Sequence, residues 1–111
     1  MANADDLRRL AHALPGVEEY PHFDRIAFKA RATVVTLAPD GLTANFKFAP
    51  DEQALKTTVA PDAFSALPNA WGARGWTVGR LAALSEAELE AALRTAHAKG
   101  SGKAAKARAR R

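Results

Sequence analysis

The basic and aromatic side chains of this chain have the types and spacing that can hold phosphates and bases. Arg25 and Lys29 fall on one face of a predicted strand, and Lys47 falls on the polar face of another. Residues 71–81 contain both tryptophans, two arginines and three glycines. Cationic side chains on a sheet face can neutralise phosphates, and an exposed tryptophan can stack on bases or wedge between them. The side chains predicted to contact nucleic acid are Arg25, Lys29, Lys47, Arg74, Trp76 and Arg80.

Two other interpretations of these residues stay open. The basic groups can form an ordinary solvated sheet face, paired with Asp24, Glu18 or Asp40, while the tryptophans close one end of the core. Alternatively, the sheet face or the tryptophan segment can anchor a protein partner, because Trp, Tyr and Arg dominate protein–protein interfaces. Binding to phosphates weakens steeply with salt, whereas an apolar contact changes little, so the salt response separates the two classes of partner.

Catalysis and metal binding are not predicted. His22 and Asp24 can share one face of an extended segment, but no nucleophile motif accompanies them. Glu18 and Glu19 add oxygen ligands nearby, yet the spacing of these four residues matches no recognised metal site. The chain has no cysteine, which excludes a thiolate nucleophile and a cysteine-ligated metal. We therefore expect a protein that is not an enzyme and needs no cofactor and no metal.

The positive charge of the chain is concentrated at its C-terminus. Of the 16 basic residues, six lie in residues 99–111, and none of the 12 acidic residues does. Residues 1–98 therefore carry a formal charge of −2, although the whole chain carries +4. We predict a single domain over residues 1–98 and a disordered basic tail over residues 99–111, which adds an electrostatic contact for DNA. The acidic N-terminus and the lack of a long apolar run predict a cytoplasmic protein without a membrane segment, and we expect it to be a monomer.

The first half of the chain predicts one helix followed by strands. A helix is expected over residues 3–14, where leucines recur at helical spacing before Pro15 and Gly16. Strands are expected over residues 25–30, 33–37 and 42–48, with a further short strand near Tyr20 as an open alternative. In the third strand the apolar face is predicted to consist of Leu42, Ala44, Phe46 and Phe48.

The second half predicts two helices around a tryptophan strand. A helix begins at Pro50 and ends near Val59, residues 61–70 are irregular, and a glycine loop leads into a strand from Trp76. The last helix begins with a capping box at Ser85 and is expected to end at Gly100. The order α-β-β-β-α-β-α predicts an α+β fold, a curved antiparallel sheet with helices packed on one face.

Three motifs carry a resemblance to a known family. They are YPHFDRIAFK over residues 20–29, the Phe46–Lys47 strand leading to PDEQ at residues 50–53, and GARGWTVGRL over residues 72–81. In this order and spacing, residues 5–98 resemble the MmcQ/YjbR family of small bacterial proteins. The resemblance implies a frataxin-like (CyaY-like) double-wing fold. It also implies DNA binding, a label that rests on analogy with a viral transcription-factor domain that binds DNA through its sheet. The chain departs from the family at Ala96–His97, where relatives often carry an aromatic residue, and in its basic tail.

Overall fold

The structure, a computed structural model, describes residues 1–101. Eight of its elements match predicted segments, two short ones fall in segments predicted to be irregular or looped, and a 3₁₀ turn lies where no element was predicted. In chain order they are α1 (Ala4–His12), β1 (Glu18–His22), β2 (Arg25–Lys29), β3 (Thr33–Leu37), β4 (Thr43–Lys47), α2 (Pro50–Val59), β5 (Phe64–Ala66), α3 (Ala70–Ala73), β6 (Trp76–Arg80), the 3₁₀ turn η1 (Leu81–Ala83) and α4 (Glu86–Ser101).

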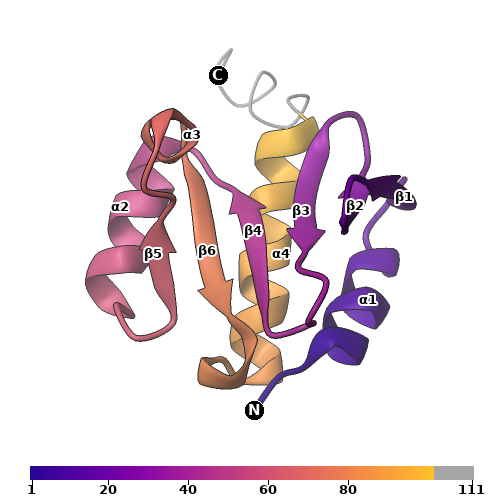
Figure 1. Ribbon diagram of the computed structural model, residues 1–111, viewed down its shortest axis with the longest axis horizontal. Coiled ribbons are helices and arrows are strands. Elements are labelled where there is room, and N and C mark those ends of the chain that lie inside the picture. Colours follow the sequence, from indigo (N-terminus) through magenta and orange to yellow (C-terminus); the bar gives the residue numbers. More distant parts are fainter. Residues whose placement is uncertain (102–111) are drawn as a thin grey trace, which may run out of the picture.

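The strands form one antiparallel sheet in the order β1-β2-β3-β4-β6-β5. α4 packs against β3 and β4, α1 packs against α4, and α2 lies beside β5. Figure 1 looks onto the opposite face, because the strands pass in front of α4. The predicted α+β fold, with an antiparallel sheet covered by helices on one side, is confirmed. The short strand near Tyr20 is β1.

The core lies between the sheet and α4. Phe46 of β4 is fully buried, stacks on Phe48 at 5.6 Å and meets Phe64 of β5 edge-on at 6.0 Å. Leu89, Ala92, Leu93 and Ala96 form the buried stripe of α4 that faces these rings. This stripe is the one predicted from helical spacing.

Helices α1 and α4 both begin with reciprocal caps. Asn3 accepts the backbone N–H of Asp6 at 2.9 Å, and the Asp6 carboxylate accepts the backbone N–H of Asn3 at 3.1 Å. At the start of α4, Ser85 Oγ accepts the N–H of Glu88 at 3.0 Å while the Glu88 carboxylate accepts the N–H of Ser85 at 2.7 Å. The predicted capping box is therefore present.

Replacing Ser85 by Ala is expected to lower the free energy of unfolding by about 1 kcal/mol, because one free N–H of α4 loses its acceptor. Urea denaturation measures the change. Ser65→Ala is the matched control, since Ser65 is exposed on β5 and should shift stability by less than about 0.5 kcal/mol. Equal effects of the two substitutions would show that the cap does not stabilise α4.

Four local predictions were wrong. Residues 64–66 form strand β5 within the segment predicted to be irregular, and residues 70–73 form helix α3 within the predicted glycine loop. Leu42, predicted on the apolar face, is 65% exposed because it lies in the turn before β4. α4 ends at Ser101, one residue beyond its predicted end at Gly100. The part of the predicted tail from residue 102 onward lies outside the described residues.

Candidate nucleic-acid interface

The sheet face that the helices leave uncovered is called the open face. Strand register places its side chains in three rows across the strands. The middle row carries no charge. It consists of Tyr20, Ala27, Thr36, Asn45, Val78 and Ser65, which are paired in that order from β1 to β5.

A cationic row lies on each side of the middle row, two residues further along each strand and therefore about 7 Å away. One row contains Glu18, Lys29, Lys47 and Trp76, with Glu18 paired to Lys29 and Lys47 paired to Trp76. Arg25 and Arg80 occupy the other, at the opposite end of their strands. The sixth predicted residue, Arg74, lies in the turn between α3 and β6. All six predicted residues therefore lie on the open face or at its edge.

Lys47 sits at the more strongly positive end of this face. Its Nζ donates to the backbone oxygen of Arg74 at 3.0 Å and lies 5.5 Å from the centre of the Trp76 ring. Partial burial lowers the pKa of Lys47, and the nearby positive charges of Lys99 and Arg74 lower it further. Lys47 therefore lies in the positive field of two further cations, Arg74 from the α3–β6 turn and Lys99 from the end of α4.

Arg25 is placed differently from the other predicted cations. Its guanidinium turns over the middle row and donates to Thr36 Oγ1 at 2.8 Å and to the Thr36 backbone oxygen at 3.1 Å. Burial lowers the pKa of Arg25, whereas the charges of Asp24 and Asp40 act in the opposite direction. The side chain of Arg25 therefore lies flat on the open face and does not extend outward toward a phosphate.

The predicted cations do not pair with carboxylates within residues 1–101. The ion pairs of this region lie on the helical side and on β1, and join Arg8 and His12 to Glu19, Arg9 to Asp6 and Glu86, and Arg94 to Glu90. Arg80 donates instead to the backbone oxygen of Asp62, and Lys29 lies 5.6 Å from the centre of the Tyr20 ring. The acid nearest to this set in the sheet register is Glu18, whose backbone pairs with that of Lys29 and which accepts the hydroxyl of Tyr20 at 3.0 Å.

The tryptophan segment is held tightly by backbone contacts. Gln53 of α2 donates from one amide nitrogen to the backbone oxygens of Gly72 at 2.9 Å and Trp76 at 3.0 Å. A Cβ on Gly72 would lie 1.8 Å from the backbone oxygen of Leu67, and one on Gly75 would lie 1.9 Å from that of Phe48. Gly72 is therefore required for space, while Gly75, at φ +104°, is required for both space and backbone angle.

Replacing Gly75 by Ala is expected to lower the free energy of unfolding by about 2 kcal/mol or more, through backbone strain and the clash with Phe48. Gly16→Ala is the matched control, since Gly16 has φ +76° but no atom within 4 Å of an added Cβ. Gly16→Ala should lower the free energy of unfolding by only about 1 kcal/mol, the cost of a residue with a side chain in the left-handed backbone conformation. Thermal denaturation compares the two. Equal losses of stability would show that the close approach to the Phe48 backbone is not what requires glycine at position 75.

The open face contains a hollow of about 340 Å³, called the open-face hollow. Its apolar wall comes from Leu67, Trp71 and Trp76. Its polar lining comes from His22, Arg25, Thr33, Thr36 and Asn45. It lies over β3 and β4, between α3 and the β1–β2 hairpin, which is turned out of the plane of the other strands in Figure 1.

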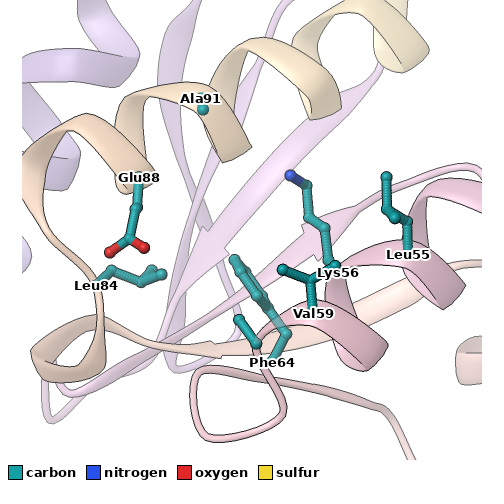
Figure 2. Close-up of a pocket in the computed structure, with 8 residues that line it drawn as sticks. Leu55, Lys56, Val59, Phe64, Leu84, Glu88 and Ala91 are labelled. Carbon is teal, nitrogen blue, oxygen red and sulfur yellow. The ribbon is translucent and has the colours of Figure 1, made fainter.

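A second hollow of about 250 Å³ lies between α2 and α4 on the helical side. Figure 2 shows Lys56 of α2 and Glu88 of α4 on its two sides, with Phe64 and Leu84 between the helices. Lys56 Nζ lies 5.8 Å from the centre of the Phe64 ring. The exposed side chains of Leu55 and Val59 border this groove, so α2 buries little of its apolar surface.

Sequence reasoning missed several residues of the open face. Thr36, His22 and Asn45 were not predicted as site residues, although alternation along residues 43–47 already places Asn45 on the same face as Lys47. Lys99 was assigned to the tail, but α4 carries it to the positive end of the sheet. Placing Thr36 and His22 on this face required the strand register, and placing Lys99 required the length of α4.

The residues considered for catalysis and metal binding do not converge. Glu19 points to the helical side, where it binds Arg8 and His12, while Glu18 and His22 share the open face. Across residues 1–101, no three His, Asp or Glu side chains are grouped closely enough to hold a metal ion. No helix in the described part of the chain is long and apolar enough to cross a membrane.

Comparison with known proteins supports the fold. No family model matches the chain, and no curated protein matches it. Among solved structures, the crystal structure of the Deinococcus radiodurans protein DR2400, described with the domain DUF419, matches with a TM-score of 0.71. The match covers 86% of this chain and 76% of that protein at 20% sequence identity. At this identity the chain is shown to share the fold of DR2400 and nothing further.

Proposed function

We propose that this protein binds DNA weakly, without enzymatic activity and with low sequence specificity, through the open face and the basic C-terminal residues. The observation that carries this proposal is the presence of cations from separate strands on one uncovered face, without carboxylate partners among residues 1–101. Such an arrangement can neutralise phosphates of a backbone laid across the sheet.

The positive end of the open face favours an anionic ligand in particular. Burial lowers the pKa of Lys47, and the positive charges of Lys99 and Arg74 lower it further. A phosphate placed beside Lys47 would offset the repulsion from these two cations. Contacts between these cations and phosphates would position the DNA backbone and carry no sequence information.

A protein partner is the second candidate. The exposed Trp71, with Arg74 lying 5.3 Å from the centre of its ring, has the composition of an interface anchor. Binding through this anchor would persist at moderate salt, whereas DNA binding through the cations would not.

Fluorescence anisotropy with labelled DNA tests the proposal. The full chain and a chain ending at Ser101 are titrated at low and moderate salt. We expect the shortened chain to retain salt-sensitive binding with reduced affinity, because the open face remains. Loss of all binding on truncation would assign the activity to residues 102–111 and overturn the role of the sheet.

The family and the cellular location belong to the same proposal. The resemblance of residues 20–29, 46–53 and 72–81 supports membership of the MmcQ/YjbR family, and the fold shared with DR2400 is compatible with it. We propose a bacterial cytoplasmic protein that acts as a monomer. Light scattering of the purified chain tests the oligomeric state.

A further inference from the structure

We propose that the DNA bound by this protein is single-stranded, with one unpaired base inserted into the open-face hollow. This inference rests on the proposed DNA binding and specifies the form of the ligand. It starts from the lining of the hollow, where aromatic rings and free polar groups lie together between two cationic rows.

The polar lining offers hydrogen-bonding groups that the described protein does not use. The side-chain amide of Asn45 and the ring nitrogens of His22 have no hydrogen-bond partner within residues 1–101, and both line the hollow. An amide presents a donor and an acceptor side by side, which matches the edge of a nucleobase. The Watson–Crick edge of a base, unlike the edges that face the grooves of a duplex, is free only in an unpaired or flipped base.

The apolar wall suits a flat ring. Trp71 is 54% exposed, and Trp76 is half-buried beside it in the lining of the hollow. Stacking of bases on aromatic rings is the usual source of affinity for single strands and tolerates any base. A hollow of about 340 Å³ lies at the lower end of the range for small-ligand clefts, so it suits one base rather than a duplex.

The cationic rows place phosphates on both sides of that base. Lys47 and Arg80 lie on opposite sides of Asn45, each about 7 Å along the strand direction. A strand that crosses the open face with one base in the hollow would therefore meet a cation before and after that base.

The test uses the full chain and three labelled DNAs of equal length: an oligodeoxythymidine, an abasic strand and a blunt duplex. Anisotropy at low salt should show the thymidine strand bound about tenfold or more tightly than the abasic strand.

Asn45→Ala and Trp71→Ala should each reduce this ratio of affinities while leaving the affinity for the abasic strand within about twofold, since neither side chain carries charge. Leu55→Ala, in the groove on the helical side, is the control and should change neither value.

The possible outcomes distinguish failure of the base-insertion inference from failure of the proposed DNA binding. Equal, salt-sensitive binding of all three DNAs would overturn the base-insertion inference and leave the proposed function standing. A high ratio that Asn45→Ala and Trp71→Ala leave unchanged would place the base elsewhere and also overturn it. Absence of binding to every DNA would overturn the proposed function itself. Because Trp71 is exposed, its substitution should leave the circular dichroism spectrum unchanged.

Discussion

Replacing Phe46 by Ala is expected to lower the free energy of unfolding by about 3–5 kcal/mol. Phe46 is fully buried in the central strand β4, between Val35 and Thr77 in the register, and its ring contacts Phe48 and Phe64. The Phe46 ring packs closely against Gly79, where an added Cβ would lie 2.6 Å from the ring, so removing the ring leaves a cavity in a tightly packed core.

Urea denaturation measures this effect as a fall in the midpoint of about 1 M or more. Phe23→Ala is the matched control, because Phe23 is 96% exposed at the tip of the β1–β2 hairpin. It should change stability by less than about 0.5 kcal/mol. If Phe46→Ala cost no more than Phe23→Ala, the core described between the sheet and α4 would be incorrect.

The second large effect is expected from reversing charge on the open face. The double substitution Arg74→Glu and Arg80→Glu removes two exposed cations at the two ends of β6. Affinity for DNA at low salt should fall about tenfold or more, and the slope of log affinity against log salt should decrease by about 2. Anisotropy titrations over a salt series measure both quantities.

The matched control reverses Arg9 and Arg94, which are also exposed but lie on the helical side. This variant has the same net charge as the first, so long-range attraction is reduced equally. We expect its affinity to lie between that of the unsubstituted protein and that of the open-face variant. Equal weakening by the two variants would indicate that total charge, and not the open face, governs binding.

Alternation along single segments predicted which residues face the helices. Residues 43–47 alternate between buried and half-buried as their sequence predicts, and the stripe of α4 follows the helical repeat. The capping box at Ser85 was equally predictable, because its two hydrogen bonds join residues three apart. These features are local, so the sequence of each segment determines them.

Features that depend on pairing between distant segments were not predictable in this way. β5 has only three residues, and its strand conformation depends on pairing with β6. The open-face hollow requires the register that aligns Thr36, Asn45 and Val78 across β3, β4 and β6. Arg25 was predicted from its position on β2, but its contact with Thr36 depends on the neighbouring strand. Tertiary pairing, rather than local pattern, determines these positions.

An NMR titration of the full chain with single-stranded DNA tests most directly whether the open face is the surface that binds. The indole N–H signals of Trp71 and Trp76 and the side-chain amide signals of Asn45 should shift together as DNA is added. The backbone signals of α1 and α2 should remain unchanged, because those helices lie on the other side of the sheet. Shifts confined to the helices or to residues 102–111, with both indole signals unmoved, would contradict this assignment.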